Sequence, residues 1–241
     1  MVNLKIVRQL HDADTELYII PLLENGDFDI PEQLILSKAE QLFTQEMLDK
    51  KIHLFTLPRS EKRIFIHFIK VKNEDFIALE EYRSEGAKIS KVFNKHKFSS
   101  AVFVLGSLPE YLLAYTEGFI LSDYRFEKYK TVKEESTLGN IYLLNQTLKS
   151  NELNLLKAVT EAVYIARDLI NEPGSELTAV ELAKQIVSLG KKDGFYTEVF
   201  NMQKIKALKM GGLLSVNKGS IDPPTFSILE WKPKKRLIAS H

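Results

Sequence analysis

The chain has 241 residues, enough for one large or two small domains with a buried core. Its 33 basic and 32 acidic side chains leave a net charge of +1, which gives no overall drive toward nucleic acid or an anionic membrane. The absence of cysteine excludes disulfides, thiolate nucleophiles and cysteine-based zinc sites.

The N-terminal segment lacks the apolar core of a signal peptide. No stretch approaches the roughly 20 apolar residues that a membrane-spanning helix needs. We therefore expect a cytoplasmic protein.

Strand and helix patterns alternate over the first 147 residues. Runs rich in β-branched and aromatic residues predict strands, and apolar residues at helical spacing predict helices. The predicted strands are 2–7, 16–23, 52–57, 63–69, 101–105 and 141–144, and the predicted helices are 31–48, 75–96 and 109–124. The apolar run 16–23 indicates a strand covered on both faces. This alternation predicts an α/β sandwich with a mixed sheet.

The stretch 148–178 predicts one long helix, a stop and the start of another helix. Ser150 or Asn151 is expected to cap the first helix, because a short polar side chain can accept its unpaired backbone N–H groups. One apolar stripe follows helical spacing, at Leu155, Leu156, Val159, Val163, Ala166 and Ile170.

Pro173 and Gly174 end this helix, because proline lacks an N–H and glycine suits a positive-φ turn. Thr178 with Glu181 forms a capping-box pattern that opens the next helix. A long helix leading into a rigid turn is typical of a domain joint. We predict an N-terminal domain over 1–147, a joining helix over 148–172 and a second domain over 173–241.

The second domain is predicted to contain helices at 178–189 and 202–209 and strands at 196–200 and 226–231. The apolar run 213–216 is interpreted as a further strand, and the glycines beside it, Gly211-Gly212 and Gly219-Ser220, as turns. An α/β unit normally continues past such elements, so this domain looks incomplete. We expect exposed strand edges and apolar surface after Pro173.

The residues do not combine into a catalytic or metal-binding motif. Each histidine is interpreted as a packed or edge residue, and Asp12 with Asp14 as a solvated turn. Adjacent carboxylates point apart on a helix, and the glycine clusters match no phosphate-binding loop. The residues considered and set aside are His11, His53, His67, His96, His241, Glu80, Glu81, Glu134, Glu135, Gly106 and Ser107.

Residues 124–130 (YRFEKYK) interleave basic and aromatic side chains, as a single-strand nucleic-acid surface does. A solvated helix end with two packed aromatics explains the pattern equally simply. Basic residues that extend such a surface are Lys88, Lys91, Lys95, Lys97 and the run from Arg125 to Lys133. A non-catalytic nucleic-acid or nucleotide-binding module of macro-like fold therefore stays open as an alternative.

Four blocks in one order resemble the leucyl (cytosol) aminopeptidase family. Residues 167–173 (RDLINEP) followed by Leu177-Thr178 resemble its R-D-L-x-N-x-P…L-T signature. Upstream, Thr116-Glu117-Gly118 and 124–130 resemble its E-G…Y-R-F-D-K-Y-K segment. Downstream, 209–220 (KMGGLLSVNKGS) resemble its G-M-G-x-L-L-A-V-x-x-G-S block, and Pro223-Pro224 with 226–231 continue the match.

This resemblance implies a macro-domain-like N-terminal α/β sandwich, a long interdomain helix and a peptidase domain. It implies homo-hexamers in which two divalent metals, zinc or manganese, activate a water that removes N-terminal residues from peptide substrates.

The family's metal-binding and catalytic segments, such as G-K-G-x-T-F-D-x-G-G, lie beyond these blocks. Here Trp231 is followed by KPKKRLIASH, and Lys232, Lys234 and Lys235 lack the G-K-G context. We therefore assign no catalytic, metal or substrate-binding residue. We expect a truncated peptidase domain that is inactive alone, whether through a frameshift, a premature stop or a designed end.

Overall fold

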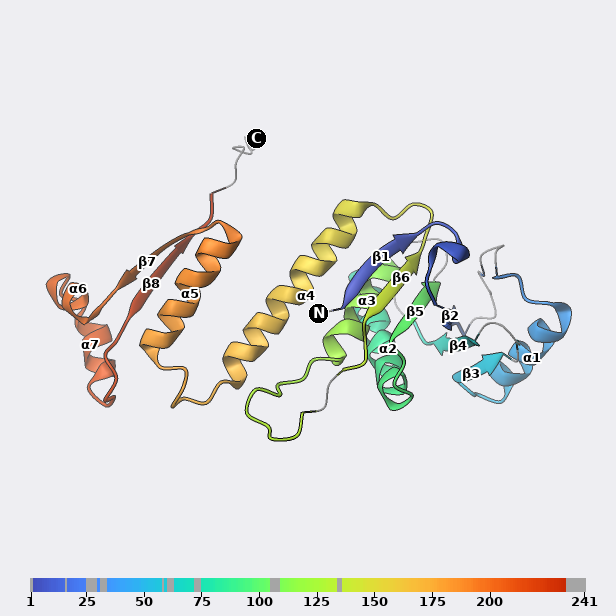
Figure 1. The fold of residues 1–241 in the computed structure, drawn as a ribbon, viewed down its shortest axis with the longest axis horizontal. Coiled ribbons are helices and arrows are strands. Elements are labelled where there is room, and N and C mark those ends of the chain that lie inside the picture. The colour runs from blue at the N-terminus through green and yellow to red at the C-terminus, as the bar shows by residue number, and fades with distance from the viewer. Residues whose placement is uncertain are drawn as a thin grey trace. The chain divides into compact units, whose positions relative to one another are not determined.

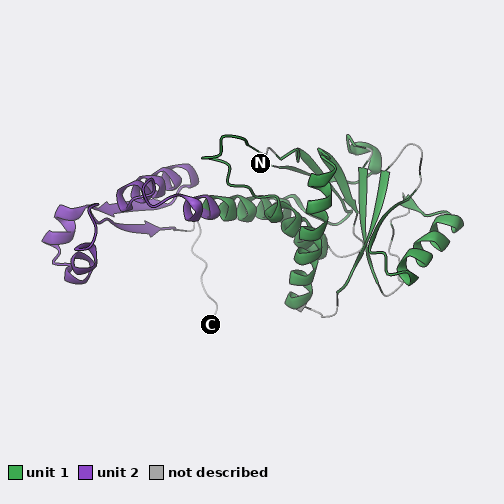
Figure 2. Ribbon diagram, turned by 90° about the horizontal axis from the view of Figure 1, so that it is seen from below, with its two compact units in different colours: residues 1–165 green, residues 166–241 purple. Residues whose placement is uncertain are grey.

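A computed structural model describes residues 2–15, 17–24, 30, 34–57, 59, 63–71, 75–104, 109–133 and 136–232. The chain forms two compact units, unit 1 (Met1–Ile165) and unit 2 (Ala166–His241), shown in Figure 2. The division falls inside helix α4 (Ser150–Asn171), within the range assigned above to the joining helix. The predicted domain boundaries themselves stay a prediction. None of the helices in the described residues is long and apolar enough to cross a membrane.

Unit 1 is built on a six-stranded sheet in the order β1-β6-β5-β2-β4-β3. All neighbouring pairs are parallel except β3 and β4, which run antiparallel, so the mixed sheet predicted from the sequence is confirmed. The strands are β1 (Asn3–Val7), β2 (Leu17–Leu23), β3 (Leu54–Leu57), β4 (Arg63–Ile69), β5 (Ser100–Val104) and β6 (Asn140–Leu144).

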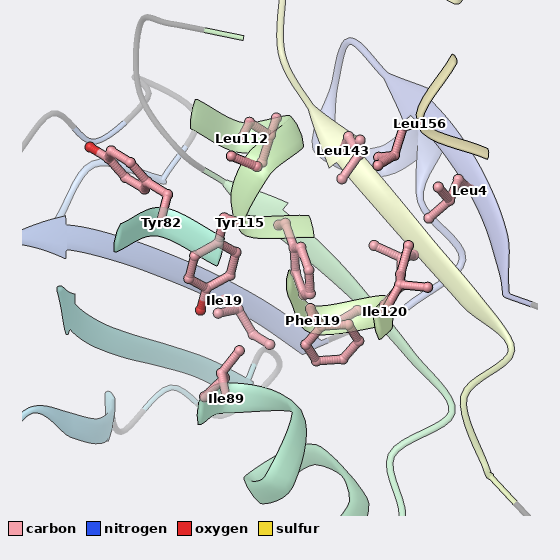
Figure 3. Packing of buried hydrophobic residues seen from close by; sticks show 14 of the residues in the cluster. Leu4, Ile19, Tyr82, Ile89, Leu112, Tyr115, Phe119, Ile120, Leu143 and Leu156 are labelled. Atoms are coloured by element: carbon pink, nitrogen blue, oxygen red, sulfur yellow. The ribbon is translucent and has the colours of Figure 1, made fainter. Parts of the chain in front are cut away.

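Helices cover both faces of this sheet and bury two apolar clusters (Figure 1). One cluster joins the sheet to α2 (Asp75–Lys95), α3 (Pro109–Ser122) and the first part of α4. Leu112, Tyr115 and Phe119 of α3 lie at its centre beside Ile19 of β2 (Figure 3). The other cluster packs the opposite face against the short helix η1 (Leu10–Asp12) and α1 (Lys38–Asp49).

The central strand shows why its sequence is apolar throughout. Strand β2 reads LYIIPLL and pairs with β5 on one side and β4 on the other. Its alternate side chains enter the two clusters, so six of its seven residues are buried. The expectation of a strand covered on both faces is therefore confirmed.

Unit 2 contains a two-stranded antiparallel sheet and short helices. Its elements are α5 (Ala179–Asp193), β7 (Tyr196–Phe200), α6 (Met202–Ala207), α7 (Gly211–Asn217) and β8 (Phe226–Glu230). Thr178 caps α5 by accepting the Glu181 N–H, as predicted, and Gly194 ends it with φ of 80°. This positive φ favours glycine.

Three local predictions are wrong. Residues 213–216 lie in helix α7 rather than in a strand, and Gly211-Gly212 form its first turn rather than a turn between elements. A four-residue apolar run does not distinguish the two states, because its periodicity is too short to measure. Helix α1 begins after the cap Ser37, which exchanges hydrogen bonds with Glu40, and not near residue 31.

The cap of α4 also differs from the prediction. Neither Ser150 nor Asn151 lies outside the helix, since α4 begins at Ser150 itself. The Glu152 carboxylate reaches back to accept the Lys149 N–H at 2.8 Å. The amide oxygen of the buried Asn145 accepts the Leu148 N–H at 2.8 Å, so the turn before the helix is held from β6.

Candidate functional site

The described residues contain no group of three or more histidine, cysteine, aspartate or glutamate side chains placed to hold a metal ion. The carboxylates considered in the sequence serve local structure instead. Asp12 accepts the Gln9 N–H at 3.1 Å, and Glu80 lies 3.5 Å from Arg83. The pair at 134–135, residues 106–107 and His241 lie outside the described residues.

One buried polar group lies between the sheet and its helices. His67 of β4 is 5% exposed, and its Nδ1 lies 2.8 Å from the hydroxyl of Tyr115 on α3. Its Nε2 faces the buried carboxylate of Glu85 on α2 at 3.6 Å, and Lys88 binds the other oxygen of Glu85 at 2.7 Å. A ring with its proton on Nε2 accepts a hydrogen bond from the Tyr115 hydroxyl at Nδ1 and directs its N–H toward the Glu85 carboxylate.

Burial fixes the charge state of this group. Desolvation, aided by the charges of Lys88 and His53, lowers the pKa of His67 to about 4. Burial also raises the pKa of Tyr115 well above its ordinary value. Both rings are therefore neutral near pH 7. The group joins β4 to α2 and α3, and the sequence interpretation of His67 as a packed residue fits this position.

The other histidines lie apart from this group. The His53 ring is half exposed and lies 2.9 Å from a Glu24 carboxylate oxygen. His11 lies 3.5 Å from Asp12 on the surface, and His96 stacks on Phe98 at the end of α2. None of the three approaches the other donors closely enough to form a catalytic set within the described residues.

The E-G motif of the first aminopeptidase-like block lies where α2 and α3 cross. A Cβ on Gly118 would lie 1.9 Å from the Arg83 carbonyl oxygen, and one on Gly86 would lie 1.9 Å from the Tyr115 carbonyl oxygen. Glu117 binds the Arg83 side chain at 2.9 Å. The motif therefore permits close helix packing, and nothing in its geometry is catalytic.

Residues 124–130 form a loop after α3 rather than a helix end. Tyr124 packs edge-on against Tyr164 of α4, with ring centroids 5.2 Å apart, and the Tyr164 hydroxyl donates to the Ile120 carbonyl at 2.6 Å. Arg125 lies 4.0 Å from Asp123. Lys130 binds Glu127 at 2.8 Å.

Residues 124–130 thus help to pack α4 onto α3. Their charged side chains lie beside neighbours of opposite charge. Lys88 likewise binds Glu85. The nucleic-acid alternative finds no support in this arrangement or in the comparisons below.

The last three blocks, at 167–178, 209–220 and 223–231, lie in unit 2. Helix α4 ends at Asn171, and residues 173–177 form a hydrogen-bonded turn before Thr178. The glycine-rich block 209–220 forms α7 and its flanking turns. A hollow of about 540 Å³ lies beside α5, lined by Val180, Ala183, Lys184, Val187, Val199, Asn201, Met202, Gln203, Pro223, Pro224 and Thr225. The residues that line it include no carboxylate or imidazole, and their one charged side chain, Lys184, pairs with Glu181 at 2.9 Å.

Comparison with known proteins agrees with the order of these blocks. The family model of the cytosol aminopeptidase family, catalytic domain, matches residues 164–240. A probable cytosol aminopeptidase of Clostridium perfringens is 29% identical over 94% of this chain and 49% of its own length. One of Aquifex aeolicus is 32% identical over 70% of this chain and 35% of its own length. The chain thus spans half or less of the length of these relatives.

Solved structures share the fold. A mutant of tomato leucine aminopeptidase superposes with a TM-score of 0.77 at 17% identity, covering 94% of this chain and 50% of that protein. A bottromycin maturation enzyme in complex with Mn gives 0.69 at 18% identity, covering 91% and 46%.

The fold and the packed motifs define a protein of mixed α/β class with a helix between its two units. The predicted resemblance is confirmed: the chain resembles a leucyl aminopeptidase over its N-terminal domain and the start of its peptidase domain.

Proposed function

We propose that this chain works in the removal of N-terminal residues from peptides, as the N-terminal half of a leucyl aminopeptidase. The observation that carries the proposal is the family match over 164–240. This range includes the turn after α4 and both strands of unit 2. The order of the four sequence blocks supports it, as do the names of the relatives that match both units.

The zinc or manganese pair of such an enzyme does not fit the residues described here. Two divalent ions need several carboxylate, imidazole or amine donors directed to one place, and the described residues bring no three together. We therefore derive no step of hydrolysis from this chain. What its own residues supply is a set of contacts that hold helix α4 to the rest of unit 1.

These contacts lie at the start of α4 and further along it, within unit 1. At its start, Asn145 holds the entering turn, and Arg8 donates to the carbonyls of Asn145 and Leu148 from the end of β1. Further along, Tyr164 anchors the helix to α3. We propose that these contacts make 148–172 a joining element between domains at 1–147 and 173–241. We also propose a cytoplasmic location and a homo-hexamer for the complete protein.

Hydrolysis of a leucyl chromogenic amide with added manganese or zinc tests the proposal. The purified chain alone should show no turnover above a metal-only blank. A single polypeptide that joins residues 1–232 to the C-terminal half of the Clostridium perfringens relative should regain it.

Turnover by the isolated chain would show that its own residues are catalytic and would overturn this account. A well-folded joined polypeptide without turnover would remove the aminopeptidase assignment. Reading the gene past the codon for Trp231 in all three frames gives an independent check, because the proposal expects G-K-G-x-x-F-D-x-G-G in one of them.

A further inference from the structure

The buried polar group between β4, α2 and α3 is connected to the surface of unit 1 through Lys88. The Lys88 side chain is 65% exposed, whereas the side chains of Glu85 and His67 are buried. The Lys88 ammonium lies 2.7 Å from one oxygen of the Glu85 carboxylate, and the other oxygen lies 3.6 Å from Nε2 of His67. One carboxylate therefore separates a surface cation from a buried imidazole.

Helix α2 holds these two charges in place. Residues three apart on a helix lie on one face, so the Lys88 side chain reaches back over Glu85. Gly86 lies directly against α3, because a Cβ on it would be 1.9 Å from the Tyr115 carbonyl oxygen. The close approach of the two helices keeps the Glu85 carboxylate beside the ring, and the carboxylate keeps the ammonium near it.

The groups that face the His67 ring belong to three neighbouring elements. They are Tyr115 of α3, Glu85 and Lys88 of α2, and His53 just before β3. Burial raises the pKa of Tyr115, so this hydroxyl stays neutral. His53 is half exposed and lies beside a Glu24 carboxylate oxygen. Burial lowers the pKa of His67 most, followed by the charge of Lys88 and then by that of His53.

The Lys88 charge opposes proton uptake by this group. A second proton on the His67 ring enters at Nδ1, and the Tyr115 hydroxyl then changes from donor to acceptor. The ammonium repels the imidazolium that forms and keeps the Glu85 carboxylate engaged. In a partly buried site one such charge changes a pKa by about one to two units.

We propose that Lys88 acts as a surface switch for the charge of this buried group: loss of its positive charge lets His67 take up a proton and form an ion pair with Glu85. The charge state of a contact that joins β4 to α2 and α3 is thereby set from the surface of unit 1. The proposal does not depend on the proposed function.

The test follows the His67 ring by NMR in the intact chain as the pH is lowered, and the spectrum of His67→Gln assigns its signal. The parent ring should reach its midpoint near pH 4. Lys88→Gln should raise this midpoint by at least one pH unit, whereas Lys88→Arg keeps the charge and should titrate as the parent does. Lys91→Gln is the matched control, because it removes a charge from an exposed lysine of the same helix and should leave the midpoint unchanged.

Denaturant titrations at pH 7 and pH 5 give a second measurement if the chain unfolds before the midpoint is reached. Lys88→Gln should be less stable than the parent at pH 7, because Glu85 loses its partner. Its further loss of stability at pH 5 should be smaller than in the parent, because the folded ring then binds its proton more nearly as the unfolded chain does. A midpoint that does not rise, or an equal loss between the two pH values in Lys88→Gln and the parent, overturns the proposal. So does an equal rise in Lys91→Gln.

Discussion

Strand β2 is apolar throughout and lies inside a six-stranded sheet, whereas β8 carries three apolar residues among five and lies in a two-stranded sheet. In β2 nearly every side chain is buried, with Ile19 and Ile20 at 2% and 0% exposure. In β8 the corresponding values are 37% for Ile228 and 52% for Leu229. An apolar sequence therefore indicates that a strand needs buried surroundings. The elements packed around the strand decide whether its side chains are buried.

The same difference separates the two units as wholes. Unit 1 buries two large apolar clusters on the faces of its sheet. Among the described apolar residues of unit 2, Ala183, Ile205 and Pro224 are buried. Since hydrophobic burial is the main favourable term in folding, the two units should differ widely in local stability.

The largest expected effect is in hydrogen exchange. Amides of β2 and β5 should exchange only when unit 1 unfolds, at a cost of about 5–15 kcal/mol, whereas those of β7 and β8 should exchange through openings of less than about 2 kcal/mol. Limited proteolysis should likewise cut after Pro173 first and leave residues up to about 144 intact. Equal protection of the amides in both units would contradict the expected difference in local stability.

A smaller effect is expected from Gly118→Ala in the crossing of α2 and α3. The added methyl group would lie 1.9 Å from the Arg83 carbonyl oxygen, so the helices must separate, at a cost of about 3 kcal/mol in the free energy of unfolding of unit 1. Gly212→Ala in α7 is the matched control, because no heavy atom lies within 4 Å of its added carbon. Chemical denaturation followed in unit 1 should report no loss for the control.

The smallest effect concerns pH. The pKa of His67 is about 4 in the folded chain against an ordinary 6.5, so the unfolded chain binds the proton first. The stability of unit 1 is therefore complete above pH 6.5 and falls as the pH drops toward 4, by about 2 kcal/mol at pH 5.

Denaturant titrations between pH 7 and 5 measure this slope. His67→Gln should remove this dependence of stability on pH. His11→Gln, a change at an exposed ring, should keep it. A parent chain whose stability does not change over this range would show that folding leaves the pKa of His67 at its ordinary value.

The sequence predicted the elements of unit 1 well because their patterns are long. The apolar runs of β2 and β4 and the helical spacing of α2 and α4 each extend over enough residues to show one period. The start of α1 was misplaced because apolar Leu34 and Ile35 continue its pattern, although both precede the helix, where Leu34 is buried in the second cluster and Ile35 is exposed. The Ser37 and Glu40 capping box was the signal that locates this start.

Contacts between distant segments could not be predicted in this way. Nothing in the pattern around His67 indicates that Tyr115 and Glu85 meet it from two helices. The aminopeptidase-like blocks were recognisable by resemblance, but the reason for Gly118 appears only when α2 lies against α3. For residues 213–216 the pattern was too short, and the helix was missed.

The place of β6 has a consequence for the time course of synthesis. Strand β6 lies between β1 and β5 and pairs in parallel with both, although Asn3 and its partner Asn140 are 137 positions apart. At about 5–20 residues per second, on the order of 10 s separates the appearance of β1 from that of its sole neighbour in the sheet. β1 stays without its partner throughout that interval, and the edge of β5 that faces β6 lies open once residues 100–104 have been made. The arrival of five residues, 140–144, then closes both edges at once.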